Sequence, residues 1–565
     1  MTTLVARPER VRHADERQQS VATAHFRLML LMLLFLGGTL AIGARLTWLG
    51  IFNGAAANRY AGGSLLPQRG DIVDRNGVPL ARTIDAWSIG IHPAKLIGDK
   101  RQLARDLARL MPERDEATYY RIATSSMNFT YLRRRAMPEL VAAVNALGEP
   151  GIAYAREPER LYPQTTLAAH VLGYTDFDGK GVAGMERVLD KRLTDPMQRG
   201  KPVALSIDSR VQAAMESELY AALVKHSAVG AAGLVLDVHT GEIVAMASLP
   251  VFNPNRVGQS PDDARRNSVT QSVYELGSTF KPITVAGAIE AGVATSMTRK
   301  YDATAPLQVG GFRIRDDHAQ NRYMNVPEAL VYSSNIVTAR IAEEMGQERM
   351  ATLFRSVGFQ GPPDVELMEK GSSIWPTYWA RTTVMTTAYG HGIAVTPLQL
   401  ANAYATLVNG GIWRPTTLMK VAPGKAPEGR RVFSEATSAR MRQLLRMVVL
   451  DGTGKKGDAA GFRVGGKTGT AEKAVGGGYS RNSNVSTFAA VFPMDAPRYV
   501  VIAMMDAPKG TADTYGFTSA AWTAAPVVSR VIARAGPMLG VIPNERRDID
   551  VADLASLVWN PKEAH

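Results

Sequence analysis

The stretch Tyr274-Glu-Leu-Gly-Ser-Thr-Phe-Lys-Pro282 decides how the rest of this sequence is interpreted. Ser278 and Lys281 are three residues apart, and residues with this spacing share one face of a helix. Pro282 favours the first helical turn, where a missing backbone N–H leaves no hydrogen bond unmade. The pattern therefore predicts a helix that begins at Ser278, where the helix dipole favours developing negative charge and Oγ can meet the Lys281 amine.

This serine and lysine are a candidate nucleophile and base. A lysine desolvated beside another cation can lose its proton and then accept one from a hydroxyl. The same residues also fit an ordinary helix start with a surface lysine. The pair therefore needs support from elsewhere in the chain.

Ser333-Ser334-Asn335 lies between a helical stretch that ends near Val331 and another that begins around Ile336. A hydroxyl at this point could relay a proton to a leaving group, and the amide could hold a substrate. The competing interpretation is a simple helix N-cap, for which Ser and Asn are favoured.

Lys467-Thr468-Gly469-Thr470 falls on an expected strand from Arg463 to Ala471, after two further glycines. Glycines beside a strand lysine let another backbone approach closely. An edge strand of this kind can pair with an extended peptide, while lysine and threonine hydroxyls meet its carboxylate. A glycine-rich bulge is the alternative.

The three motifs together, in this order, are the set found in penicillin-binding proteins and serine β-lactamases. The chain resembles the class B penicillin-binding proteins, and most closely the division-specific, FtsI-type members of alphaproteobacteria. Further segments that carry the resemblance are Arg69-Gly-Asp-Ile-Val-Asp-Arg-Asn-Gly77, Arg160-Leu-Tyr-Pro163, His170-Val-Leu-Gly173, Gly184-Met-Glu186, Val395-Thr-Pro-Leu-Gln-Leu400 and Asn409-Gly-Gly411. The family pattern usually has Gln at the position of His391, so the sequence departs from that pattern in this loop.

The resemblance implies a role for each motif residue. Ser278 is the expected acylated nucleophile and Lys281 its base, with proton relay and substrate positioning by Ser333 and Asn335. The donor carboxylate is expected at Lys467, Thr468, Gly469 and Thr470, and the oxyanion hole at the backbone N–H groups of Ser278 and Thr470.

The same resemblance implies the substrates and partners. They are peptidoglycan stem peptides and lipid-linked precursors, β-lactams, an FtsW-like glycosyltransferase and other division proteins. Neither a metal nor an organic cofactor is implied. The nine histidines include no H-E-x-x-H spacing, which argues against a metal hydrolase.

Composition narrows the remaining possibilities. The 565 residues contain no cysteine, which excludes a thiolate nucleophile and any disulfide framework. The net charge is +13, but the longest basic run is Arg133-Arg134-Arg135, without a nucleic-acid-binding motif around it. We therefore interpret the positive charge as a solvated surface.

One segment predicts a membrane anchor. Leu28 to Ala44 contains no charged residue, and with its apolar flanks it approaches the roughly 20 residues that a membrane-spanning helix needs. Five arginines precede it, which predicts a cytoplasmic N-terminus and a periplasmic catalytic part at the inner membrane. A cleaved signal peptide is the rival, but the small residues Ala55-Ala56-Ala57 lie too far beyond the apolar run.

The expected architecture is multi-domain: a transmembrane helix, an α+β pedestal module and a transpeptidase domain with an antiparallel sheet covered by helices. The expected parts are a disordered cytoplasmic tail (1–25), the anchor (26–48), the pedestal (60–205), the transpeptidase domain (206–545) and a C-terminal tail (546–565). The sheet is expected to use strands from both sequence ends, at 231–237, 243–248, 463–471, 486–492 and 499–505. A helix from Thr518 to Ala535 is expected to stop at Gly536-Pro537.

Several alternatives stay open at this point. A β-lactamase would need a group that activates water, and no Glu-x-x-Leu-Asn occurs between Asn335 and Lys467. Carboxypeptidase activity differs only in the acceptor and remains possible as a side reaction. An elongation-specific transpeptidase shares the three motifs, and a non-catalytic β-lactam sensor or division scaffold is the alternative of another class.

Overall fold

The computed structural model describes residues 9–52, 68–475 and 478–559. The chain divides into two units, residues 1–66 and 67–565, which are described separately. The first contains one helix, α1 (Glu9–Phe52), in which Val21–Arg45 has a mean hydropathy of 2.0 and is long and apolar enough to cross a membrane. A signal sequence near the N-terminus can meet the same criteria of length and hydropathy. Residues 9–25, expected to be disordered, are helical, because no proline interrupts the run that continues into the apolar segment.

The second unit begins with the pedestal. Its strands are β1 (Ile72–Val73), β2 (Pro79–Ile91), β3 (Thr130–Ala136), β4 (Ile152–Leu161), β5 (Tyr174–Thr175), β6 (Gly181–Ala183) and β7 (Val203–Ala204). Its helices are η1 (Pro93–Lys95), α3 (Lys100–Leu110), α4 (Glu116–Ala123), α5 (Pro138–Asn145), α6 (Ala169–Leu172), α7 (Gly184–Val188) and α8 (Asp190–Thr194).

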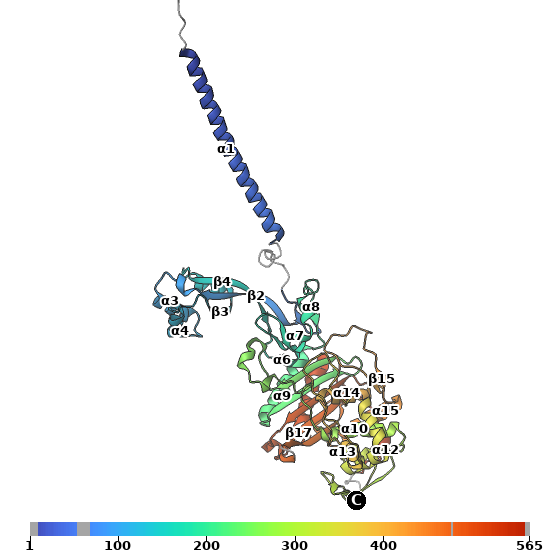
Figure 1. Ribbon diagram of the computed structural model, residues 1–565. Helices are drawn as coiled ribbons and strands as arrows, with labels where there is room; N and C mark the ends of the chain where they lie inside the picture. The colour runs from blue at the N-terminus through green and yellow to red at the C-terminus, as the bar shows by residue number, and fades with distance from the viewer. Residues whose placement is uncertain (1–8, 53–67, 476–477, 560–565) are drawn as a thin grey trace, which may run out of the picture. The chain divides into compact units, whose positions relative to one another are not determined.

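The hairpin expected at Arg69 to Gly77 is present. Strands β1 and β2 pair antiparallel, and the Asp74 carboxylate closes the turn by accepting the N–H groups of Asn76 and Val78, each at 2.8 Å. Strand β2 then continues as the centre of a second group of strands, paired with β3 on one side and β4 on the other. Helices α3, α4 and α5 enclose a small core against these strands (Figure 1).

The larger domain is built on a five-stranded antiparallel sheet in the order β16-β17-β18-β8-β9. Its strands are β8 (Gly230–Asp237), β9 (Ile243–Leu249), β16 (Gly465–Val475), β17 (Gly478–Phe492) and β18 (Tyr499–Asp506). The prediction of one sheet made from both sequence ends is confirmed, and β17 and β18 are central as expected. Strand β16, which carries the Lys-Thr-Gly motif, is an edge strand.

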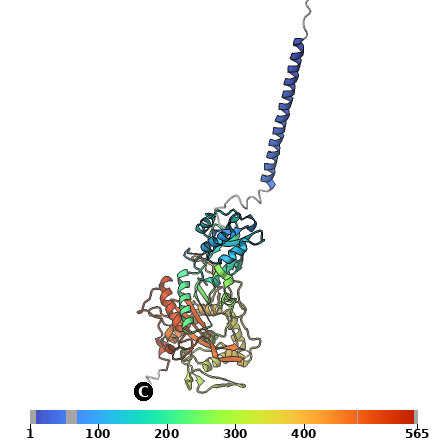
Figure 2. The ribbon, with the colours of Figure 1, turned by 90° about the vertical axis from the view of Figure 1, so that its left-hand side faces the viewer.

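Helices cover both faces of this sheet. Helices α9 (Ser209–Lys225) and α16 (Ala524–Met538) lie side by side against one face, as Figure 2 shows, and share a core with it. Helices α10 (Lys281–Glu290), α14 (Pro397–Val408) and α15 (Glu435–Leu450) share the core of the other face.

The remaining elements lie mainly between β9 and β16. They are η2 (Pro254–Gln259), η3 (Asp263–Arg265), η4 (Gly277–Phe280), β10 (Tyr301–Ala303), β11 (Leu307–Val309), β12 (Phe312–Ile314), β13 (Arg322–Met324), α11 (Val326–Val331), α12 (Asn335–Ser356), α13 (Arg381–Thr387), β14 (Ile412–Trp413), β15 (Arg430–Arg431) and η5 (Lys455–Gly457), with η6 (Ala512–Thr514) and α17 (Ala552–Ala555) near the C-terminus.

The expected limits of α16 were wrong at both ends. The helix begins at Ala524 rather than Thr518 and continues through Pro537 to Met538. The residues before it are held in another conformation by the neighbouring strand. Thr518 O accepts the Ser486 hydroxyl at 2.6 Å, and the Thr518 hydroxyl accepts the Asn484 amide at 2.8 Å.

Candidate active site

Ser278 lies on a short three-ten turn, η4, that leads directly into α10. Lys281 is the first residue of α10 and Pro282 follows in the same turn. The prediction from Pro282 is thus confirmed for the helix start, but the serine precedes the α-helix by one three-ten turn. Ser278 is partly exposed, whereas Lys281 is 0% exposed.

Two glycines allow the serine turn and the edge strand β16 to touch through bare backbone. A Cβ on Gly277 would lie 2.9 Å from the carbonyl oxygen of Thr470, and one on Gly469 would lie 2.4 Å from that of Leu276. Gly277 also has φ +56°, a conformation that side chains disfavour. The absence of both side chains brings Ser278 next to the strand that carries Thr470.

The Lys281 ammonium points to the second motif rather than to the serine beside it. Its Nζ donates to the carbonyl oxygen of Ser333 and, at 3.1 Å, to the Ser333 hydroxyl. Among the side chains that the structure describes, none forms a hydrogen bond with Ser278 Oγ. The expected pairing of Oγ with Nζ is therefore absent from this arrangement, although both groups remain on the same turn.

Lys467 reaches the same hydroxyl from the edge strand. Its Nζ donates to Ser333 Oγ at 2.9 Å and to the carbonyl oxygen of Thr468 at 3.1 Å, and its side chain is 0% exposed. The structure thus brings one residue from each of the three motifs together at Ser333 Oγ. These contacts join positions that are far apart in the sequence.

Burial determines the charge of the two lysines. It lowers the pKa of Lys281 to about 7, and the carboxylates of Asp316 and Asp317 only partly oppose that change. It lowers the pKa of Lys467 well below its ordinary value, and the neighbouring Lys281 adds to the shift. Two buried ammonium groups that share one hydroxyl cannot both stay charged, so a neutral amine is available near neutral pH.

Ser333 has an uncommon backbone conformation. Its φ is +61°, in a region that non-glycine residues avoid, and such residues concentrate at functional sites. It follows α11 and precedes α12, as the sequence predicted. The N-cap role belongs to Ser334, whose Oγ accepts the N–H of Val337 at 3.1 Å. The capping interpretation therefore applies to Ser334, and the functional role of Ser333 stays a prediction.

Asn335 does not reach either lysine. Its Nδ2 donates to the carbonyl oxygen of Arg315 at 2.8 Å, so its amide is directed to the loop before β13. The third-motif threonines are each hydrogen-bonded. Thr468 Oγ1 lies 2.7 Å from Thr453 Oγ1, and Thr470 Oγ1 accepts the N–H of Ala520 at 3.1 Å.

Thr453 and Ala520 contact residues of the third motif, and both were missed in the sequence. Thr453 lies in Asp451-Gly-Thr-Gly454 after α15, where the letters indicate only a turn. Ala520 lies in the loop that was expected to be helical. A contact between distant segments leaves no local pattern, so no sequence signal could have identified either residue.

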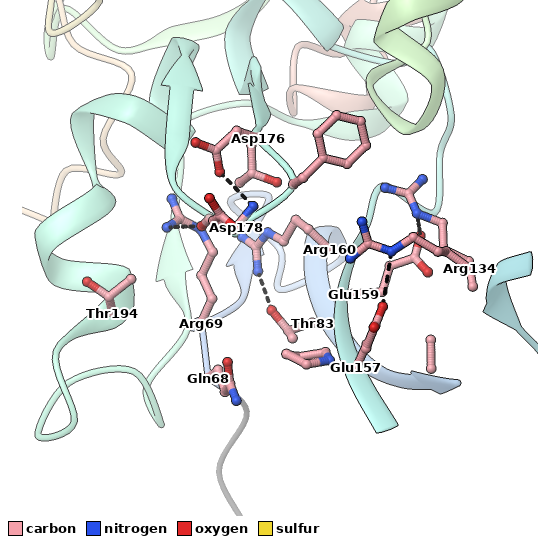
Figure 3. A pocket seen from close by; sticks show the side chains of 16 residues that line it. Gln68, Arg69, Thr83, Arg134, Glu157, Glu159, Arg160, Asp176, Asp178 and Thr194 are labelled. Carbon is pink, nitrogen blue, oxygen red and sulfur yellow. Dashed lines mark hydrogen bonds and ion pairs between the residues drawn. The ribbon is translucent and has the colours of Figure 1, made fainter. Parts of the chain in front are cut away.

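Away from the three motifs, a cavity of about 390 Å³ lies in the pedestal, between the β5–β6 turn and strands β2 to β4 (Figure 3). Several of its charged side chains are hydrogen-bonded to neighbouring side chains. Arg134 Nε donates to Glu157 at 3.1 Å, and Arg160 Nη1 donates to the Thr83 hydroxyl at 3.2 Å (Figure 3).

Beside this cavity lies a buried ion cluster. Arg69 Nε and Arg160 Nε each donate to one oxygen of Glu186 at 2.7 Å, and Arg69 Nη1 donates to Asp190 at 2.6 Å. Arg69, Arg160 and Glu186 come from three of the segments that carried the family resemblance. Because these three residues form one ion cluster, the segments that carry them have a shared structural role in the pedestal.

Comparison with known proteins agrees with this geometry. Residues 231–529 match the penicillin binding protein transpeptidase domain, and residues 64–201 match the penicillin-binding protein dimerisation domain. The chain belongs to the class B penicillin-binding proteins. This class B penicillin-binding protein is 39% identical to the probable peptidoglycan D,D-transpeptidase FtsI of Caulobacter vibrioides, over 99% of this chain and 96% of that protein.

Two further relatives support the assignment. The peptidoglycan D,D-transpeptidase FtsI of Escherichia coli K12 is 30% identical, over 78% of this chain and 79% of that protein. The crystal structure of penicillin binding protein 3 from Mycobacterium tuberculosis, complexed with aztreonam, superposes with a TM-score of 0.67 at 26% identity. That match covers 85% of this chain and 98% of the other.

Proposed function

We propose that this protein is a serine-type peptidoglycan D,D-transpeptidase that cross-links stem peptides during septal wall synthesis and is inhibited by β-lactams. The observation that carries the proposal is the convergence of Lys281 and Lys467 on Ser333 Oγ, beside the turn that presents Ser278. This arrangement supplies a nucleophile, a buried amine of lowered pKa and a hydroxyl between two lysines. The FtsI names of the similar Caulobacter and Escherichia coli proteins support the septal role.

The first half-reaction acylates the serine. Ser278 Oγ attacks the carbonyl carbon of the penultimate D-Ala, and neutral Lys281 accepts the hydroxyl proton. The bond to the terminal D-Ala breaks, and the proton passes through Ser333 to the leaving amine. Lys467 holds the Ser333 hydroxyl in place for this transfer. The products are an ester on Ser278 and free D-Ala.

The second half-reaction transfers the acyl group. The amine of a neighbouring stem peptide attacks the ester carbonyl and gives up a proton along the same route in reverse. A new amide forms and Ser278 regains its proton. Asn335 would move from its contact with Arg315 to hold the donor peptide, which the exposed position of that hydrogen bond permits.

The edge strand suits recognition of the donor. Strand β16 can pair with an extended peptide, and Thr468, Gly469 and Thr470 would then bind its carboxylate with Lys467. The N–H groups of Ser278 and Thr470 would form the oxyanion hole, where developing charge meets fixed donors. The close backbone approach at Gly277 and Gly469 supports this assignment, because it fixes the two segments relative to each other.

The remaining assignments follow from the anchor and the family. We assign a cytoplasmic tail to 1–25, the anchor to 26–48, the pedestal to 60–205, the transpeptidase domain to 206–545 and a terminal segment to 546–565. The arginines before the apolar segment favour a cytoplasmic N-terminus, with the catalytic domain in the periplasm at the inner membrane. An FtsW-like glycosyltransferase would supply glycan strands from lipid-linked precursors.

Labelling with a fluorescent penicillin tests the chemistry. The full-length protein in detergent should acquire a covalent label that Ser278→Ala abolishes, with Ser272→Ala as the matched control. A label that persists in Ser278→Ala would remove Ser278 as the nucleophile. Slow loss of the label distinguishes a transpeptidase from a β-lactamase.

A cellular experiment tests the biological role. Depletion of the protein should produce filaments, the consequence of blocked septation. Rounded cells would instead assign the protein to elongation. Normal division with a Ser278→Ala variant would favour a sensor or scaffold.

A further inference from the structure

The C-terminal segment, expected to be a tail, is packed into the catalytic domain. Leu554 of α17 is 1% exposed within the main core, and Leu557 and Val558 pack against the same core. Arg440 of α15 pairs with Asp553 at 2.5 Å. We call residues 552–559 the C-terminal clasp.

The clasp contacts α11 and the two residues that flank it. Immediately before the helix, Asn325 Nδ2 donates to the carbonyl oxygen of Leu557 at 2.8 Å. Within the helix, Glu328 accepts the N–H of Trp559 at 3.0 Å. Immediately after the helix, the Tyr332 hydroxyl donates to the carbonyl oxygen of Trp559 at 2.6 Å.

A stacked cation strengthens the last contact. The guanidinium carbon of Arg322 lies 4.9 Å from the centre of the Trp559 ring and 5.6 Å from that of Tyr332. Arg322 also donates to Glu328 at 2.7 Å. The guanidinium group therefore joins the aromatic ring of the clasp to both α11 and the residue that follows it.

The position of Tyr332 connects the clasp to the active site. Tyr332 immediately precedes Ser333, whose left-handed backbone conformation costs free energy and persists only where surrounding contacts enforce it. Helix α11 is only six residues long, and a helix of that length depends on tertiary contacts for its stability. The three hydrogen bonds and the stacked guanidinium supply such contacts immediately before Ser333.

We propose that the C-terminal clasp, through Trp559 and Tyr332, is a positioning element that holds Ser333 between the two active-site lysines. The proposal rests on the proposed function, since Ser333 matters only if Ser278 is acylated. Trp559 and Tyr332 act through Ser333 and do not touch substrate. Loosening the clasp lets the Ser333 turn relax and admits water to the Lys281 amine.

The test compares two truncations of the full-length protein. A chain that ends at Leu557 loses the Trp559 contacts, whereas a chain that ends at Trp559 retains every contact named above. We expect the shorter chain to be acylated by fluorescent penicillin about tenfold more slowly or worse, as displaced catalytic groups generally are. The chain that ends at Trp559 should react at the full-length rate.

Point variants refine the comparison of the two truncated chains, because a single substitution is less disruptive to folding than a truncation. Tyr332→Phe removes one hydrogen bond and should slow acylation about threefold, the effect of a typical single hydrogen bond. Tyr323→Phe, which alters an exposed side chain of β13 in the same region, should change nothing. Trp559→Phe keeps a ring over Arg322 and should retain more activity than Trp559→Ala.

The pH profile separates positioning from mere stability. The groups that face Lys281 are Ser333, Lys467, Asp316 and Asp317, and none is altered by these variants. If the clasp positions Ser333, the acidic limb of the acylation profile should shift to higher pH, because a hydrated Lys281 binds its proton more tightly. Acylation of the chain that ends at Leu557 at the full-length rate overturns the proposal. So does a loss of acylation rate that is proportional to the loss of folded protein, if the pH profile of acylation does not shift. Absence of Ser278-dependent label in the unaltered protein instead contradicts the proposed function.

Discussion

The pedestal and the candidate active site each contain a group of buried cationic side chains, and the two groups have opposite kinds of partners. In the pedestal, Arg69 and Arg160 share Glu186, and Arg69 also reaches Asp190. In the active site, Lys281 and Lys467 donate only to neutral oxygens of Ser333 and Thr468. Within the described residues, no carboxylate pairs directly with either lysine.

The pKa values follow this difference. Burial alone would lower the pKa of Arg69, but Glu186 and Asp190 outweigh it and raise the pKa. Burial of Lys281 is opposed only by the more distant Asp316 and Asp317, and the pKa falls to about 7. A buried cation in this protein thus keeps its charge where a carboxylate accompanies it, and it can lose its proton near neutral pH where none does.

The largest expected effect is on chemistry, from Lys281→Arg. A guanidinium cannot lose its proton at any relevant pH, so the site keeps a cation but loses its base. Acylation by penicillin should fall about 10³-fold or more, within the range measured for general bases. Lys473→Arg, which conserves a pair with Asp506, is the matched control and should react normally. A Lys281→Arg rate within tenfold of the unaltered protein would assign the base elsewhere.

The next effect is on stability, from Glu186→Gln. This change leaves Arg69 and Arg160 buried without their shared carboxylate and should lower the free energy of unfolding by about 3–5 kcal/mol. Denaturant unfolding measures it. Glu157→Gln, which breaks the more exposed pair with Arg134 (Figure 3), should cost under about 1 kcal/mol. Equal losses in the two variants would contradict the structural role of the cluster.

The dependence of acylation on pH sharpens the contrast without any mutation. Lys281 must be neutral to accept the Ser278 proton, and it is protonated below its pKa of about 7. The acylation rate should therefore fall as pH drops through 7, approaching about tenfold per pH unit. Rate constants from pH 5 to 9 provide the test, and a flat profile over pH 5 to 7 would rule out a neutral lysine base.

The smallest expected effect concerns Thr453. Thr453→Val removes the hydroxyl that lies 2.7 Å from Thr468 Oγ1 and should slow acylation about threefold to tenfold. Thr453→Ser keeps the hydroxyl and should retain most of the rate. Because Thr468 is expected to bind the carboxylate, Thr453→Val should slow acylation by a penicillin methyl ester less than acylation by the free acid. Equal losses for both would place the effect of Thr453 elsewhere.

Much of the fold could be predicted because its signals are local. Pro282 identified the start of α10, and the apolar runs identified β8, β17 and β18. The flanks of the Ser333 motif were also identified correctly. Each of these features depends on residues within a few positions of one another.

The assembled site could be predicted only in part. The spacing of Ser278 and Lys281 indicated a direct contact, but the long lysine side chain reaches Ser333 instead, 52 residues away. The start of α16 was wrong because contacts with β17 hold Thr518 out of the helix. The clasp looked like a tail because its partners on and beside α11 lie more than 200 residues earlier.

The backbone contact between the serine turn and β16 has a consequence under antibiotic selection. Mutation can enlarge a side chain, but it cannot add one at Gly277 or Gly469 without a collision with Thr470 or Leu276. These two glycine positions therefore offer no tolerated substitution by which a side chain could exclude a β-lactam. Resistance changes in this protein should accumulate among residues that surround this backbone contact, where a substitution can alter the inhibitor's fit and spare the natural donor.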